Sequence, residues 1–183
     1  DLLMLNDYVY EFELTANRGD CFSMVGLSRE FAILTGQKAK FPAFTVDEND
    51  GPIAGRLAVA IDNQELCQRF MTRLVTNVKV GPSPLWMQNC LRNSGIRPTN
   101  NVVDVTNFVM LELGQPMHAY DYDHIKGQQL TARLAKEGET IQTLDGTDRE
   151  LSPDMLVIAD AEGPVGVAGV MGGFDSEVTN ETT

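Results

Sequence analysis

The sequence lacks the features that mark membrane, secreted and nucleic-acid-binding proteins. No stretch approaches 18 uninterrupted apolar residues, and no basic segment precedes an apolar leader, so membrane and secretory roles are not expected. The 14 Lys and Arg residues are scattered singly among 26 Asp and Glu, which gives a net charge of −12. Autonomous nucleic-acid binding requires clustered cations. Any RNA partner is therefore expected to be held mainly by other parts of a larger protein.

Cysteine is scarce as well. Cys21, Cys67 and Cys90 are odd in number and form no CxxC pair, which excludes a disulfide framework and a zinc knuckle. Reduced thiols in a cytoplasmic protein are expected. No Ser/Pro/Gly-rich linker divides the 183 residues, and 43% of them are apolar, so residues 1–183 are predicted to form one domain. Because the chain starts without Met, we expect a piece excised from a longer protein.

Several catalytic signatures are missing too. His118 and His124, the two histidines, are six residues apart, whereas a helical HExxH site needs a spacing of four, and no metal site is predicted. The sequence contains no GxSxG elbow and no GK[ST] phosphate loop. Nucleophilic catalysis and nucleotide triphosphate binding are therefore not indicated.

The first part of the chain predicts strands and helices in alternation. A helix after Asp20, its expected N-cap, presents Met24, Leu27, Phe31 and Leu34 on one face and ends at Gly36. Ser83-Pro84 is expected to open a helix that runs to Gly95. The predicted elements are strand 8–14, helix 20–36, a loop over 42–55, strands 56–61 and 70–80, helix 83–95 and helix 101–113, whose stripe is Val102, Val105, Val109 and Leu113.

The last third predicts short strands. Asp145-Gly146 is a two-residue hairpin signal, which predicts a turn between the strands at 140–144 and 149–151. The strands are expected at 130–135, 140–144, 149–151, 155–159 and 165–170. The order predicts an α+β fold, with a mixed, largely antiparallel or barrel-like β core and helices packed on one side.

The segment 101–121 carries the polar groups of most interest. Asp104, Thr106 and Asn107 interrupt an apolar helix, and such groups either face solvent or hydrogen-bond inside. Pro116 then ends any helix and places His118 on a rigid turn. A neutral imidazole there is suited to handling a bound water in a pocket. From the pattern alone, a pocket histidine and a packed or surface histidine both remain open.

The segment 163–173 is rich in glycine. Glycine every two or three residues within an apolar strand indicates that another backbone or a ligand approaches closely. Ala168-Gly169 and Gly172-Gly173 are candidates for the floor of a shallow pocket.

Four strings resemble one known family. In order they are ELTANRGDCFSMVGLSREFAILTG (13–36), RPTNNVVDVTNFVMLELGQPMHAYD (97–121), LDGTDREL (144–151) and GVAGVMGGFDSEV (166–178). They are similar to the B3/B4 module of the β subunit of bacterial phenylalanyl-tRNA synthetases. The match runs over nearly the whole chain, and the strings are long and specific.

The resemblance implies an editing function. The family's module hydrolyses tyrosine wrongly attached to tRNA(Phe), without a cofactor, within a cytoplasmic α2β2 ligase. ATP and Mg²⁺ would be bound elsewhere in that enzyme. The expected partners are the synthetase α subunit, the acceptor end of tRNA(Phe) and the tyrosine moiety. A non-catalytic scaffold or tRNA-contacting module of the β subunit is the alternative.

The resemblance also implies site residues. Thr106 and Asn107 match the family's Thr-Asn pair in the editing pocket, and His118 matches its pocket histidine beside the aminoacyl ester and the attacking water. Gly169 and Gly172 match glycines of the pocket wall. Thr106, Asn107 and His118 are thus the expected catalytic residues, and Thr106, Asn107, Gly169 and Gly172 the substrate-binding ones. The family's acidic residue that recognises the tyrosine hydroxyl is expected beyond Thr183.

Overall fold

A computed structural model describes residues 3, 5–41, 43–48 and 51–183 of the chain. The chain divides into two compact units. Unit 1 contains residues 1–48 and 80–118, and unit 2 contains residues 49–79 and 119–183. The single-domain prediction placed both within one domain, whereas each unit has its own contacts and is described by itself below.

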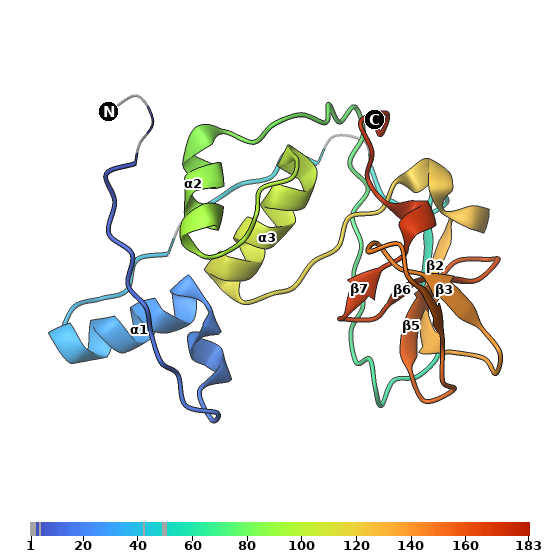
Figure 1. Cartoon of the computed structure of the whole chain (residues 1–183), viewed down its shortest axis with the longest axis horizontal. Coiled ribbons are helices and arrows are strands. Elements are labelled where there is room, and N and C mark those ends of the chain that lie inside the picture. The colour runs from blue at the N-terminus through green and yellow to red at the C-terminus, as the bar shows by residue number, and fades with distance from the viewer. Residues whose placement is uncertain (1–2, 4, 42, 49–50) are drawn as a thin grey trace. The chain divides into compact units, whose positions relative to one another are not determined.

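Unit 1 is helical. Its elements are the 3₁₀ turn η1 (Gly19–Phe22) and the helices α1 (Met24–Thr35), α2 (Leu85–Asn93) and α3 (Asn101–Leu113) (Figure 1). Helices α1 and α3 each begin with a side-chain cap, since Ser23 accepts from the Gly26 N–H and Asn100 accepts from the Val102 and Val103 N–H groups. Gly114, at φ 79°, ends α3 in the left-handed region.

Unit 2 is built on a five-stranded sheet in the order β1-β2-β5-β6-β7. β1 pairs with β2 in parallel, and the remaining neighbours are antiparallel. A hairpin, β3 with β4, forms a second sheet. The strands are β1 (Ala58–Ile61), β2 (Gln129–Leu134), β3 (Thr140–Gln142), β4 (Asp148–Glu150), β5 (Leu156–Ala159), β6 (Pro164–Val167) and β7 (Met171–Gly172), with 3₁₀ turns η2 (Tyr122–His124), η3 (Lys126–Gln128) and η4 (Phe174–Ser176).

Strand β5, in the middle of the five-stranded sheet, is buried on both faces. Alternate residues of β5 belong to different apolar clusters, because successive side chains of a strand point to opposite faces. Ile158 packs with Leu130 of β2, and Val157 packs with Ile141 of the hairpin. The predicted α+β class with a largely antiparallel sheet is confirmed, and the sheet is open rather than closed into a barrel.

Two predicted strands are wrong. Residues 8–14 and 70–80 alternate as strands do, but neither segment pairs with a strand in the described part of the chain. Tyr8 and Tyr10 are 86% and 74% exposed. Alternation predicts which side chains share a face, but a strand also needs a partner for its backbone hydrogen bonds, and local sequence does not supply one.

Two cap assignments also differ from the prediction. Asp20 does not cap α1, because its carboxylate hydrogen-bonds the Arg18 guanidinium at 2.9 and 3.0 Å and Ser23 takes the cap position. Ser83 does not cap α2, whose first flanking residue is Pro84, and its hydroxyl instead donates to Asp104. In both cases a side chain that can cap a helix has a stronger, charged partner nearby.

Candidate functional site

The polar side chains of α3 have three different environments. Asp104 is 1% exposed and accepts hydrogen bonds from the Ser83 hydroxyl at 2.5 Å and the Thr99 N–H at 2.7 Å. The Thr106 hydroxyl donates to the Val103 carbonyl at 2.7 Å. Asp104 is therefore the structural member of this group, and Thr106 retains acceptor capacity on its oxygen.

Asn107 is half-buried, and its carboxamide makes no hydrogen bond to the residues that the structure describes. A carboxamide offers two donors and one acceptor. On a rigid helix, next to Thr106, such a group is available to a ligand or to an ordered water. The sequence left open whether Asn107 serves the fold or a ligand, and its lack of a protein hydrogen-bond partner favours the second role.

His118 follows the turn that ends α3. Gly114, Gln115 and Pro116 lead away from the helix, and the imidazole remains exposed. Nearby protein nevertheless displaces part of its water, and this desolvation lowers the pKa of His118 below its ordinary value. A ring with a lowered pKa is neutral at pH 7, so one of its nitrogens can accept a proton or a hydrogen bond.

Gly169 and Gly172 lie in unit 2, whereas Thr106, Asn107 and His118 lie in unit 1. Gly169 has φ 71° in the turn after β6, and a Cβ there would meet no atom within 4 Å. Gly172 is buried in β7, opposite Gly166, and its carbonyl accepts from the Leu144 N–H. The close backbone approach that glycine spacing predicted is clearest at Gly173, where a Cβ would lie 2.8 Å from the Val165 carbonyl oxygen.

Comparison with known proteins identifies the family. A profile of the B3/4 domain matches residues 66–183. This chain belongs to the B3/4 domain family. It is 54% identical over 184 residues to the phenylalanine–tRNA ligase β subunit of Moorella thermoacetica, covering 100% of this chain and 23% of that protein. It is 50% identical to the β subunit of Carboxydothermus hydrogenoformans, covering 99% of this chain and 22% of that protein.

A solved structure is similar as well. An N-terminal fragment of the phenylalanyl-tRNA synthetase β subunit from Pyrococcus horikoshii aligns with a TM-score of 0.45 at 14% identity, covering 97% of this chain and 56% of that one. This B3/4 chain spans about a quarter of the length of the curated relatives that it matches.

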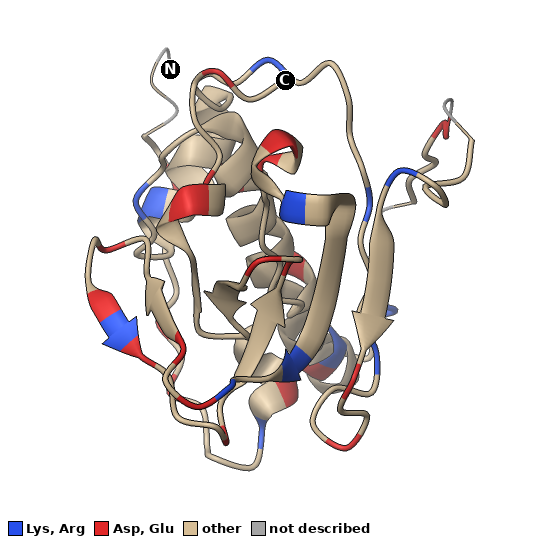
Figure 2. Cartoon of the chain, turned by 90° about the vertical axis from the view of Figure 1, so that its right-hand side faces the viewer, with Lys and Arg blue, Asp and Glu red and all other residues tan. Residues whose placement is uncertain are grey.

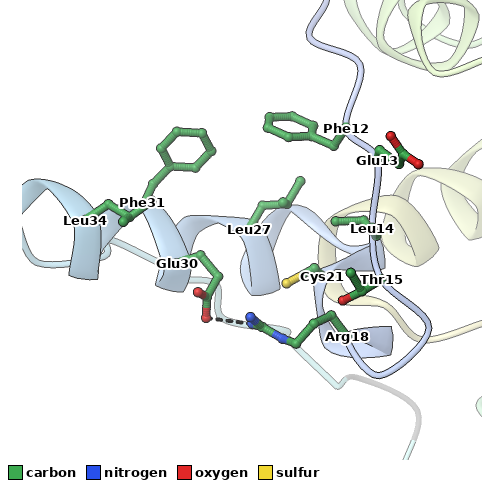
Figure 3. Close-up of a pocket in the computed structure, with 10 residues that line it drawn as sticks. All are labelled: Phe12, Glu13, Leu14, Thr15, Arg18, Cys21, Leu27, Glu30, Phe31 and Leu34. Atoms are coloured by element: carbon green, nitrogen blue, oxygen red, sulfur yellow. Dashed lines mark ion pairs between the residues drawn. The ribbon is translucent and has the colours of Figure 1, made fainter.

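Unit 1 of this B3/4 chain has two hollows that sequence reasoning did not predict. One, of about 280 Å³, lies between the extended segment 12–15 and α1, and its apolar lining includes Phe12, Leu27 and Phe31 (Figure 3). The other, of about 510 Å³, lies between the start of α1 and the end of α3. We call it the Phe22 groove; it is lined by Gly19, Asp20, Phe22, Ser23, Val25, Arg29, Met110, Leu111, Leu113, Gly114 and Pro116.

The charges of this B3/4 chain follow the sequence prediction of scattered cations. Lys and Arg positions are spread singly along the ribbon, with acidic positions between them (Figure 2). No helix among the described residues is both long and apolar enough to cross a membrane. The described residues also contain no group of three or more His, Cys, Asp or Glu placed to hold a metal ion.

Proposed function

We propose that this chain is an editing module that hydrolyses tyrosine wrongly esterified to tRNA(Phe). The observation that supports it most is that unit 1 contains both an accessible His118 whose pKa is lowered and an Asn107 carboxamide with no hydrogen-bond partner among the described residues. Both groups are of the kind that orders and polarises a water. Membership of the B3/4 family and similarity to phenylalanine–tRNA ligase β subunits support aminoacyl-tRNA as the substrate class.

The chemical need for such a site follows from molecular recognition. A synthetic site for phenylalanine is apolar, and apolar pockets reject an added hydroxyl by only about a hundredfold. An editing site can do better, because it offers polar partners to the tyrosine hydroxyl that phenylalanine would leave unpaired. The synthetic site thus favours phenylalanine, whereas the editing site favours tyrosine.

The proposed reaction is direct ester hydrolysis. A water held about 3 Å from the ester carbonyl attacks the carbonyl carbon, and much of the rate comes from this positioning. His118, neutral at pH 7, accepts a hydrogen bond from that water and takes its proton as the bond forms. Asn107 and Thr106 position the water and the ester. As the bond between the carbonyl carbon and the ribose oxygen breaks, His118 gives the proton to that oxygen, so the tRNA leaves with a free ribose hydroxyl and tyrosine is released. Gly169 and Gly172 belong to unit 2, and their substrate-binding role stays a prediction from the family resemblance.

The chain acts, on this proposal, as part of a cytoplasmic ligase with the synthetase α subunit as its partner. The module itself needs no cofactor, and ATP and Mg²⁺ serve the ligase reaction elsewhere in the enzyme. Because the chain has a net negative charge, we expect other domains of the ligase to contribute most of the tRNA-binding energy.

Deacylation is the decisive test. Tyrosyl-tRNA(Phe) and phenylalanyl-tRNA(Phe) would be incubated with this chain and with a longer β subunit that contains it. We expect tyrosine to be released preferentially, and Asn107→Ala and His118→Ala to abolish most of the release. Equal rates with wild type and both variants would refute the proposed roles.

A second function is favoured by one observation. Ile33 and Leu34 on α1 are 75% and 80% exposed, and Phe31 is 48% exposed. An apolar helix face of this kind suits contact with another protein surface. Absence of deacylation in every sample, together with loss of β-subunit stability in an Ile33→Ser/Leu34→Ser variant, would support a scaffold in place of an editing site.

A further inference from the structure

The Phe22 groove combines an aromatic surface with one unpaired cation. Phe22 is 71% exposed although it lines the groove. Arg29 also lines it, with its guanidinium 5.5 Å from the ring centre of Phe41, and it makes no ion pair with the residues that the structure describes. The groove volume of about 510 Å³ lies in the range of about 300–1,000 Å³ that small organic ligands occupy.

The acidic residue of the groove, Asp20, is paired with a cation that lines the other hollow. Arg18 hydrogen-bonds both carboxylate oxygens of Asp20, and it also pairs with Glu30 at 2.7 Å. Glu30 belongs to the other hollow, where Figure 3 shows it joined to Arg18. Arg18 is shared between Asp20 and Glu30, so it offsets only part of the Asp20 charge, and Arg29 is the cation that an anion in the Phe22 groove would meet.

The groove also ends close to the proposed catalytic histidine. Pro116 forms part of its lining, and His118 lies two positions further along the chain. Two residues of chain span at most about 7 Å, so the backbone of His118 lies within about that distance of the Pro116 end of the groove. A ligand that occupies this end of the groove is therefore within reach of one at His118.

We infer that the Phe22 groove holds the single-stranded nucleotide that precedes the terminal adenosine of the tRNA, with its base on Phe22 and its phosphate at Arg29. This assignment rests on the proposed function, in which the ester on the terminal adenosine lies at His118. Single-stranded nucleic acid is generally bound by aromatic stacking together with cations along its backbone. One aromatic ring and one cation that makes no ion pair with the described residues match one nucleotide, and an apolar peptide segment would offer Arg29 no anion.

The test compares two substrates in the longer β subunit. Tyrosyl-tRNA(Phe) carries the preceding nucleotide, whereas 3′-O-tyrosyl-adenosine lacks it. We expect Phe22→Leu to raise KM for the tRNA by about fivefold or more, from the loss of stacking, and to leave KM for tyrosyl-adenosine unchanged. Phe22→Tyr, which keeps an aromatic face, should behave as wild type. Phe44→Leu is the matched control, because Phe44 is 75% exposed and lies outside the groove.

Arg29 is tested by salt dependence. Neutralising one phosphate of a single strand changes the slope of log(kcat/KM) against log salt concentration by about 0.7. Arg29→Gln should reduce the slope by that amount, and Arg29→Lys should restore it. A merely structural role would lower the melting temperature and leave the slope unchanged, which would overturn the assignment.

Binding of the trinucleotide CCA, measured by titration calorimetry, separates this inference from the proposed function. If CCA binds and Phe22→Leu weakens it while no tyrosine ester is hydrolysed, the groove assignment stands and the editing function fails. If ester hydrolysis is normal and neither Phe22→Leu nor Arg29→Gln affects the tRNA substrate, the groove assignment is wrong. CCA binding to this chain but not to the longer subunit would also overturn it, because another protein segment would then fill the groove.

Discussion

Removal of the Asp104 carboxylate should destabilise unit 1 by about 3–6 kcal/mol. Its two hydrogen bonds, from the Ser83 hydroxyl and the Thr99 N–H, join the start of α2 and the segment before α3 to the first turn of α3. A hydrogen bond to a charged group contributes about 1.5–3 kcal/mol, and Asp104→Ala removes two of them. Ser83 is 5% exposed, so its hydroxyl would find little water in exchange.

A double-mutant cycle isolates the Ser83 bond. Ser83→Ala removes one of the two bonds and should cost about 1.5–3 kcal/mol. In the double variant the Ser83 bond is already absent, so the two single costs should exceed the double cost by about 1.5–3 kcal/mol. Asp104→Asn retains the shape and an acceptor oxygen, and should cost less than Asp104→Ala.

The fluorescence of a tryptophan at the α2–α3 contact provides the assay for this cycle. Trp86, the sole tryptophan, lies on α2 with its ring edge-to-face against Phe108 of α3 at 5.3 Å. Its fluorescence during urea unfolding therefore reports on the α2–α3 contact. A coupling energy below about 0.5 kcal/mol, with unchanged m-values, would refute the reasoning, since contacting partners normally couple by more than that.

Three further predictions concern the turn, the histidine and unit 2. Gly114→Ala should lower stability by about 1–3 kcal/mol in urea unfolding, because φ is 79° and the new Cβ would lie 3.2 Å from the Ser23 Cβ. The deacylation rate should be constant near pH 7 and fall through a pKa below about 6.5 as His118 is protonated, and a fall centred above that value would contradict the desolvated site. Arg133 hydrogen-bonds Glu139 at 2.6 Å and lowers the pKa of that carboxyl, so its stabilisation is present above the ordinary glutamate pKa and is lost as pH falls through the lowered one. Thermal unfolding should show that Glu139→Gln loses stability at pH 7 and much less at pH 2.

Sequence reasoning placed the locally determined elements well. The helix at 101–113, the strands at 130–135 and 155–159, and the Asp145-Gly146 hairpin all lie within a residue or two of the observed α3, β2, β5 and the β3–β4 turn. Capping residues, left-handed glycines and apolar runs act within a few residues of their own position. The local sequence is therefore enough to predict where such an element begins and ends.

Part of the candidate site could also be predicted from the sequence, and part could not. The resemblance supplied Thr106, Asn107 and His118, but it did not show that Asn107 has no hydrogen-bond partner among the described residues, or that Asp104 is the buried partner of Ser83. Nor did it show that Phe22 and Arg29 share a groove. Phe22 and Arg29 carry no motif of their own. Their role becomes visible only when the start of α1 is packed beside the end of α3.

The sequence by itself determined the helix ends at Gly36 and Gly114, the order of strands along the chain, and which residue types were available for chemistry. The tertiary structure decided which alternating segment joined a sheet: β2 does, whereas residues 70–80 belong to neither of the sheets that the described residues form. It also decided whether a polar side chain such as Asp104 or Asn107 was hydrogen-bonded or left available. The reason is that backbone pairing and burial depend on residues far apart in the chain, and a local sequence pattern does not specify which distant residues those are.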